Sequence, residues 1–239
     1  MKQLGVLAGF VSCLAAMSCN SEIVESTDIR TTGIYADMLV TADGGGDTEV
    51  KVKLAVGGKN GTEVKIVSPD KLVATVGDTD HTLTKSHDAY HGTFSGDDGG
   101  TEVNIAFLRG EEDDDAPDSY ATLPDPFSIE GAGSDVTVSR QESLTVTWDA
   151  SEADDPMSWD LDGSCLFTSD GSMSDNGELV LQGDDFDATP SAEDNGESCV
   201  TTLCIERSRN GSLDPLFADN EGGRIRAIQS RCVKFNSAP

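Results

Sequence analysis

Short runs of alternating apolar and polar residues constrain the fold of this chain more than any other feature. In the run from Thr48 to Val56, every even position from 50 onward is apolar, and the run from Val103 to Phe107 has an apolar residue at every odd position. A period of two is typical of a strand with one buried face. Turn-forming clusters rich in Gly and Asp follow at residues 43–46, 57–61 and 97–100. No window of a dozen residues shows a helical stripe, so the sequence predicts an all-β fold.

The spacing of strands and turns predicts two tandem β-sandwich domains. The first is expected over residues 31–109, with weaker strands at Ile34–Thr41, Glu63–Val67, Lys71–Val76 and Tyr90–Ser95. Residues 110–126 are expected to form a linker, because five consecutive acidic residues are followed by three prolines within this stretch. The second sandwich is expected over residues 127–239. Its predicted strands are Phe127–Glu130, Val136–Ser139, Ser143–Trp148, Met157–Leu161, Cys165–Thr168, Glu178–Gln182, Cys199–Arg207 and Arg224–Phe235.

The run Ser143-Leu144-Thr145-Val146-Thr147-Trp148 resembles the second strand of fibronectin type III and related bacterial immunoglobulin-like modules. In those modules the Trp lies in the core. The later Tyr residues of fibronectin modules are missing, so the resemblance implies an immunoglobulin-like architecture for the second domain. Trp148 and Trp159 both lie in phase with apolar strand positions, and core packing is expected for both.

The N-terminus has the features of an export signal. Lys2 is followed by an apolar or small run from Leu4 to Ala16, too short to cross a bilayer as a helix. The run ends in Ala16-Met17-Ser18-Cys19, which resembles the lipobox of bacterial lipoproteins. The resemblance implies a signal peptide over residues 1–18, lipidation of Cys19, a tether over residues 19–30 and a membrane partner for the lipid. Asn20 follows the Cys, which by the family's sorting rule implies the outer membrane. The alternative is an ordinary secretory signal.

Four cysteines remain in the exported chain, and they predict two disulfides. They are Cys165, Cys199, Cys204 and Cys232. Cys199 and Cys204 are five residues apart in one predicted strand, so their side chains face opposite sides and they are poor partners. Pairing Cys165 with Cys199 and Cys204 with Cys232 is favoured, because it closes two consecutive loops. Pairing Cys165 with Cys204 and Cys199 with Cys232 remains open. A hairpin register with Arg209 opposite Arg224 does not decide between them.

The net charge of −28 excludes nucleic acid as a partner, because the chain repels phosphate backbones. No Lys or Arg occurs between Gln141 and Glu206, whereas basic residues predominate after Glu206. The favoured interpretation is that the last two strands pair with acidic neighbours inside the molecule. The alternative is a recognition stripe for an anionic polymer, made of Arg207, Arg209, Arg224, Arg226, Arg231 and Lys234.

A second resemblance covers residues 207–217, which read Arg-Ser-Arg-Asn-Gly-Ser-Leu-Asp-Pro-Leu-Phe. A group of exported bacterial lipoproteins shows a similar stretch, followed by a similar basic last strand. The likeness extends over both predicted domains. It implies no activity, since none is known for that group.

Two sets of residues are candidates for binding metal. His81, His87 and His91 would share a face if they lay in one extended strand, but the intervening residues favour a turn that breaks this register. Asp-rich loops offer oxygen ligands for structural calcium, although their spacing is not that of an EF-hand. The residues concerned are Asp154, Asp155, Asp184, Asp185 and Asp187. A solvent-facing hairpin and a solvated acidic surface are the favoured interpretations.

No catalytic motif is recognisable. Ser68 to Lys71 fits Ser-x-x-Lys, but its companion motifs are absent and Pro69 favours a turn. No cofactor other than structural calcium is expected. The predicted function is therefore a non-catalytic envelope or surface module for binding, adhesion or assembly, with an envelope protein or polysaccharide as partner. The alternatives are an envelope hydrolase or glycan-binding subunit and a periplasmic metal-binding protein.

Overall fold

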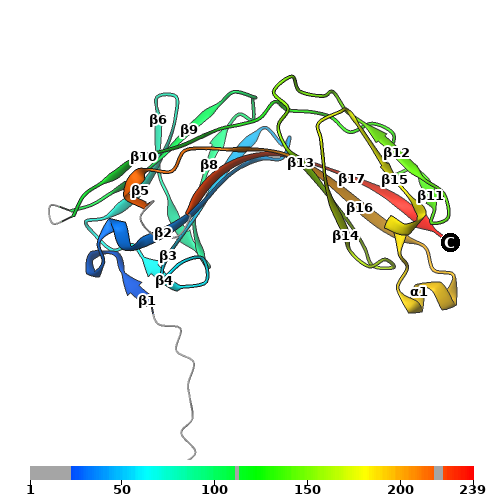
Figure 1. Cartoon of the computed structure of the whole chain (residues 1–239), viewed down its shortest axis with the longest axis horizontal. Helices are drawn as coiled ribbons and strands as arrows, with labels where there is room; N and C mark the ends of the chain where they lie inside the picture. The colour runs from blue at the N-terminus through cyan, green and yellow to red at the C-terminus, as the bar shows by residue number, and fades with distance from the viewer. Residues whose placement is uncertain (1–22, 111–112, 218–222) are drawn as a thin grey trace, which may run out of the picture.

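The computed structural model describes residues 23–110, 113–217 and 223–239. It shows an elongated arch with an N-terminal lobe at one end and a C-terminal lobe at the other (Figure 1). Two long strands run from one lobe into the other along the concave side of the arch. Within the described residues, no helix has the length and apolar character needed to cross a membrane.

A single sheet of eleven strands extends through both lobes. Its central strands alternate inward apolar and outward polar residues, as expected for a sheet with one solvated face. Strand β17 is the longest in the molecule and lies between β2 and β16. The order along the sheet is β1 (Ile23–Glu25), β4 (Thr62–Lys65), β3 (Asp47–Val56), β2 (Ile34–Ala42), β17 (Arg224–Ala238), β16 (Cys199–Asn210), β13 (Met157–Gly163) and β14 (Ser169–Met173). Three further strands join at the side: β8 (Ala89–Ser95), β7 (Thr84–Ser86) and β11 (Thr137–Ser139).

Two smaller sheets cover one face of this long sheet, one in each lobe, on the convex side of the arch (Figure 1). We call this covered face the inner face of the long sheet, and the opposite face, on the concave side of the arch, its outer face. The N-terminal lobe has β10 (Ala116–Thr122), β9 (Glu102–Leu108), β5 (Lys71–Val76) and β6 (Thr79–Thr82), while the C-terminal lobe has β12 (Leu144–Thr147) and β15 (Glu178–Leu181). The helices are short: η1 (Ser26–Asp28), η2 (Thr31–Gly33), η3 (Gly183–Phe186), α1 (Pro190–Asn195) and η4 (Pro215–Phe217). The prediction of an all-β fold of packed sheets is confirmed.

Each lobe has its own hydrophobic core, and β17 contributes to both. Ile225 and Ala227 lie in the N-terminal core, beside Met38 of β2. Phe235 lies in the C-terminal core, beside Leu203 of β16. The first six residues of β17 pair in parallel with β2, and its residues from Arg226 onward pair antiparallel with β16. The C-terminal strand therefore belongs to both lobes, which the tandem arrangement predicted from the sequence did not include.

Two of the segments expected to be irregular contain strands. Residues 116–122, predicted as part of a linker, form β10 and pair with β9. The strand is stabilised because the side chains of Ala116 and Ala121 are buried in the N-terminal core. Residues 23–25, predicted as part of a tether, form β1 and pair with β4. The predicted signal peptide at residues 1–18, and Cys19 with the first residues of the tether, lie outside the described residues.

Arg109 holds the N-terminal segment against its lobe. Its guanidinium donates hydrogen bonds to the carbonyl oxygens of Ser26 and Ile29, at 2.8 and 2.9 Å. It also pairs with the buried carboxylate of Asp70 at 3.0 Å, and its side chain is 1% exposed. Together with the pairing of β1, these contacts fix the chain to the N-terminal lobe from residue 23 onward.

Apart from residues 127–130, which make only an isolated bridge between Glu130 and Thr147, and residues 165–168, the predicted strands are present, with ends shifted by a few residues. The predicted antiparallel neighbours Cys199–Arg209 and Arg224–Phe235 are β16 and β17, but Arg209 lies opposite Ala227 and not Arg224. The register is shifted because Arg224 and Ile225 pair with β2 before β17 reaches β16. Residues 165–168, predicted as a strand, make only an isolated bridge between Leu166 and Ala188.

Candidate functional site

The two lobes are joined around one buried arginine, Arg207 of β16. Its guanidinium makes a two-pronged ion pair with Asp175, at 2.7 and 3.1 Å, and the two side chains are 1% and 0% exposed. It also donates to the carbonyl oxygens of Asp125 and Asp149, at 2.7 and 2.9 Å. These partners come from the segment between the lobes and from the ends of β12 and β14. One side chain thus ties four parts of the chain together.

The carboxylate of Asp175 is adapted to this position. Burial alone would raise its pKa, but hydrogen bonds from Arg207 and from the Trp148 indole, the latter at 2.8 Å, outweigh burial and hold the pKa below its usual value. Trp148 is 7% exposed and lies in the C-terminal core, as its resemblance to fibronectin modules implied. The indole and the carboxylate therefore satisfy each other inside the lobe.

Further contacts complete the junction, which we define as Phe127, Asp155, Asp175, Arg207, Arg209 and Arg231. The ring of Phe127 lies between two guanidinium groups, those of Arg207 at 4.9 Å and Arg231 at 5.7 Å. Arg209 makes a two-pronged pair with Asp155, at 2.5 and 3.0 Å. Gln229 of β17 donates to the carbonyl oxygen of Asp97 at 2.8 Å. Buried polar groups from both lobes are therefore paired across the junction.

The stretch at residues 207–217 forms much of the junction and its approach to β10. Asp214 is 3% exposed, and its carboxylate accepts hydrogen bonds from the backbone of Asp118 and Leu216 at 2.9 Å. A Cβ on Gly211 would lie 2.1 Å from the carbonyl oxygen of Tyr120, so only glycine fits beside β10. Phe217 is fully buried in the N-terminal core. The stretch therefore helps to join the two lobes, a structural role that its residue pattern did not predict.

The recognition stripe, which was the alternative interpretation of the basic residues, does not form one surface. Arg207, Arg209 and Arg231 face inward at the junction, and Arg224 pairs with Asp37 of β2 at 2.9 Å. These contacts favour the interpretation that acidic neighbours inside the molecule neutralise the last two strands.

The outer face of the long sheet carries a group of carboxylates, which we call the acidic face: Asp160 and Asp162 of β13, Asp170 of β14 and Glu206 of β16. Asp160 lies directly opposite Asp170 in the β13–β14 pair. No salt bridge among the described residues involves any of the four. Burial and then the charges of Asp162 and Asp170 raise the pKa of Asp160. Burial and then Asp160 raise the pKa of Glu206, while Arg226 opposes this. The acidic face is therefore a negative patch that Arg226 offsets only at Glu206.

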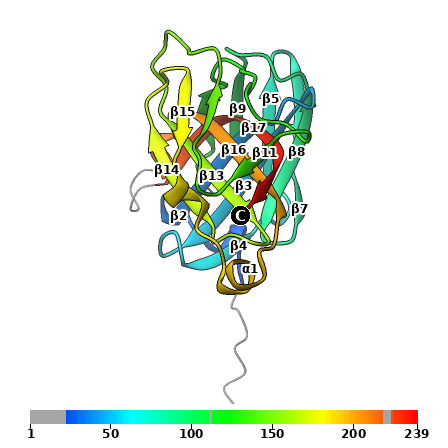
Figure 2. The ribbon, with the colours of Figure 1, turned by 90° about the vertical axis from the view of Figure 1, so that its right-hand side faces the viewer.

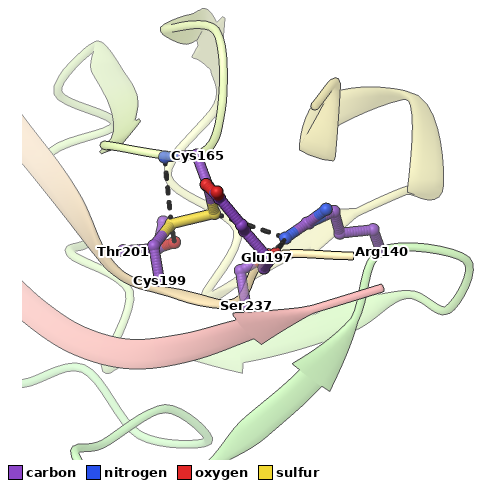
Figure 3. Close-up of a disulfide and its surroundings, with 6 residues drawn as sticks. All are labelled: Arg140, Cys165, Glu197, Cys199, Thr201 and Ser237. Carbon is purple, nitrogen blue, oxygen red and sulfur yellow. Dashed lines mark hydrogen bonds between the residues drawn. A yellow bond between two sulfur atoms is a disulfide. The ribbon is translucent and has the colours of Figure 1, made fainter. Parts of the chain in front are cut away.

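Both disulfides are present, in the pairing favoured by the sequence. Cys204 and Cys232 lie opposite each other in β16 and β17, with Cα atoms 4.1 Å apart. Cys165 and Cys199 join the loop after β13 to the start of β16. Figure 3 shows Arg140 beside this second bridge, donating to the hydroxyl of Ser237 at 3.2 Å and to the carbonyl oxygen of Glu197. Each bridge therefore fastens a different part of the C-terminal lobe to β16.

The three histidines do not come together. His81 lies in β6 of the four-stranded sheet, whereas His91 lies in β8 of the long sheet. Between them the chain passes from one sheet to the other at Leu83, whose side chain is buried in the N-terminal core. His87 lies in a turn, with a φ of 54°. The turn breaks the shared register, as the intervening residues indicated. His91 instead contacts Glu49 at 3.0 Å.

Two of the five candidate calcium ligands are engaged by other groups of the protein. Asp155 is paired with Arg209, and Asp185 accepts a hydrogen bond from the backbone of Gln182 at 2.7 Å, at the start of η3. Asp184 and Asp187 line an open pocket of about 610 Å³ beside Arg140 and Glu193. Asp154 is an exposed residue in the loop before β13. Within the described ranges, no group of three or more His, Cys, Asp or Glu side chains is placed to hold a metal ion.

The fold and junction define an all-β protein built from two lobes on one shared sheet. No known protein family and no curated protein matches the chain. Among solved structures, a chimeric titin Z1Z2 tandem aligns over 82% of this chain and 95% of its own, at 11% identity and a TM-score of 0.23. The FN1–FN3 domains of chicken CNTN1 align over 85% of this chain and 65% of theirs, at 7% identity and a TM-score of 0.29. A segment of two fibronectin type III domains from chicken tenascin aligns over 82% and 98%, at 13% identity and a TM-score of 0.23. At these scores the function has to be argued from the chain's own residues.

Proposed function

We propose that the chain is a non-catalytic binding module of the bacterial cell envelope, held at the outer membrane by a lipid on Cys19. It binds an envelope protein through the outer face of its long sheet. The observation that supports this best is the shared strand β17, which makes the two lobes one continuous sheet with an open outer face. A rigid sheet of this kind presents side chains from both lobes at fixed positions.

Buried charged side chains are candidates for catalytic groups in an enzyme, but in this chain they have a structural role. Arg207 with Asp175 and Arg109 with Asp70 are buried ion pairs that fasten segments of the chain to each other. Asp160, Asp162 and Asp170, which have no salt bridge among the described residues, lie on the outer face, where a binding partner has access to them. Charge on an accessible face sets specificity and association rate for a partner of opposite sign.

The anchor is tested by fractionating the cell envelope. Cys19→Ala is expected to move the protein from the membrane to the soluble fraction, because acyl chains add about 0.8 kcal/mol per buried CH₂ to membrane binding. Ser18→Ala is the matched control, since it leaves the cysteine in place. Retention of Cys19→Ala in the membrane fraction would contradict the proposed anchor.

The binding role is tested with a soluble form that lacks residues 1–19, immobilised on a sensor. We expect saturable binding of outer-membrane protein extract, which protease treatment of the extract removes. Binding that survives protease and disappears after glycosidase treatment would identify a polysaccharide partner and contradict the proposal. Turnover of glycan, ester or peptide substrates by the purified chain would contradict its non-catalytic character.

A further inference from the structure

Strand β14 forms the end of the long sheet and leaves one side of its backbone open. It pairs with β13, and no other strand in the described part of the chain pairs with it. Figure 2 shows β14 at the margin of the molecule. An unpaired strand edge presents a row of N–H and C=O groups to any extended segment that approaches, and proteins often protect such edges with charged side chains, especially Lys, or with Pro. The sequence of β14, Ser-Asp-Gly-Ser-Met, contains neither Lys nor Pro. The one charged residue of β14 is Asp170, which repels acidic segments and attracts basic ones.

The two faces at this edge differ in chemistry. On the outer face, Asp170 and Ser172 are exposed, and Asp170 continues the row of carboxylates from Asp160 and Asp162. On the inner face, Met173 and Trp159 are only partly buried against the C-terminal core. A segment added beside β14 would have basic side chains toward the outer face and apolar side chains toward the inner face.

The cations of β17 on the outer face, Arg226 and Lys234, lie two strands away from β13 and three from β14. No Lys or Arg occurs between Gln141 and Glu206, which includes all of β13 and β14. A second copy that paired through its own β14 would bring further carboxylates against Asp170, and like charges on adjacent strands destabilise the pair. The occupant that complements this edge is therefore a different, basic protein.

We propose that β14 is a docking edge for an extended segment of a partner protein in which Lys or Arg alternates with apolar residues. The segment extends the long sheet by one strand, with its basic side chains against Asp160, Asp162 and Asp170 and its apolar side chains over Met173 and Trp159. Backbone hydrogen bonds supply affinity in such strand addition, and the side chains on each face supply specificity. This inference rests on the proposed binding role and names the chemistry of the partner.

The first test uses a short synthetic peptide that alternates Lys with Val, titrated into the soluble form of the chain. Two N-methylated versions carry methyl groups on alternate backbone nitrogens, so that each removes the N–H donors of one edge. We expect the unmodified peptide and one N-methylated version to bind, and the other version to bind at least about tenfold more weakly. Equal binding of all three peptides would show that only charge attraction operates, and would overturn the strand-addition proposal.

The second test concerns the acidic face. The triple variant Asp160→Asn/Asp162→Asn/Asp170→Asn is expected to lose most of its affinity for the peptide, and it should fold, because the substitutions remove repulsion between neighbouring charges. The control Asp78→Asn/Asp98→Asn/Glu102→Gln removes three exposed charges from the N-terminal lobe and is expected to bind normally. Equal loss in both variants would overturn the proposed location.

The outcomes for the two proposals are separable. If the peptide does not bind but the chain still shows saturable, protease-sensitive binding of envelope protein, the docking edge is wrong and the binding role stands. If neither the peptide nor envelope protein binds, the proposed function is also contradicted.

Discussion

At the scale of single residues, the buried pair of Arg207 and Asp175 is a place where one substitution should destabilise the arch. Both side chains are almost fully buried, so removing one charge leaves the other without a partner in a low-dielectric site. We expect Asp175→Asn to lower the free energy of unfolding by about 3–5 kcal/mol. Urea denaturation measures this loss directly.

A double variant distinguishes the pair from its individual charges. Arg207→Met/Asp175→Leu removes both charges and keeps most of the volume, so we expect it to be more stable than Asp175→Asn alone. A double variant less stable than the single one would mean that Arg207 stabilises the junction through its carbonyl contacts to Asp125 and Asp149 rather than through the ion pair.

The same pair predicts a dependence on pH. The pKa of Asp175 is lower in the folded chain than its usual value of about 3.9, so its ionised form stabilises the fold above that value. This stabilisation is lost as the pH falls through the folded pKa. The difference in unfolding free energy between the wild type and Asp175→Asn should therefore shrink below about pH 4. A difference that stays constant from neutral to strongly acidic pH would contradict this assignment.

The role of Arg207 shows what residue patterns could and could not predict. The sequence showed that basic residues cluster after Glu206, and acidic neighbours were the favoured explanation. It did not show which acids, because Asp175 lies 32 positions away and is one of many carboxylates in the same region. Charge counting predicts that pairs form, and only the fold decides which groups are close enough.

At the scale of elements, alternation predicted most of the strands that have a buried face, and it missed β10 and β14. The sequence Ser-Asp-Gly-Ser-Met has no alternation, and it forms a strand because β13 offers it a partner. The indole of Trp159 covers Gly171 of β14, where a Cβ would lie 2.7 Å from the indole nitrogen. Pairing and packing supply the conformation here, so the proposed docking edge was not visible in the sequence.

The contact between β10 and the loop after β16 gives a sharp prediction. Gly211→Ala would place a methyl group against the carbonyl oxygen of Tyr120, so part of the backbone has to move. We expect a loss of about 1–3 kcal/mol, the range for overpacked sites, measured by thermal or urea denaturation. Ser212→Ala, one position further on, serves as control and should have little effect. A Gly211→Ala variant as stable as wild type would show that the loop does not contact β10 so closely.

The two disulfides differ in position, and both are expected to stabilise the C-terminal lobe. Replacing Cys204 and Cys232 with alanine should lower the free energy of unfolding by about 2–4 kcal/mol, because the unfolded chain gains conformational freedom when the bridge is lost. Peptide mapping without reductant should recover Cys165 with Cys199 and Cys204 with Cys232. A peptide that joins Cys199 to Cys232 would contradict the pairing in the structure.

At the scale of the whole molecule, two sandwiches were predicted, and the structure shows two cores joined by a shared strand. The lengths and spacing of the strands predicted the number of cores, because each core needs its own set of apolar faces. β17 is shared between the lobes because its first residues pair with β2 of the N-terminal lobe. The two strands are far apart in the sequence: Arg224 pairs with Asp37, which lies 187 residues earlier. Contacts at such distance in the sequence leave no local pattern.

Because β17 and the junction belong to both lobes, we expect the lobes to unfold as one cooperative unit. Differential scanning calorimetry on the soluble form, with its disulfides intact, tests this most directly. We predict a single transition in which the calorimetric enthalpy equals the van't Hoff enthalpy. Two separate transitions, one for each lobe, would contradict the claim.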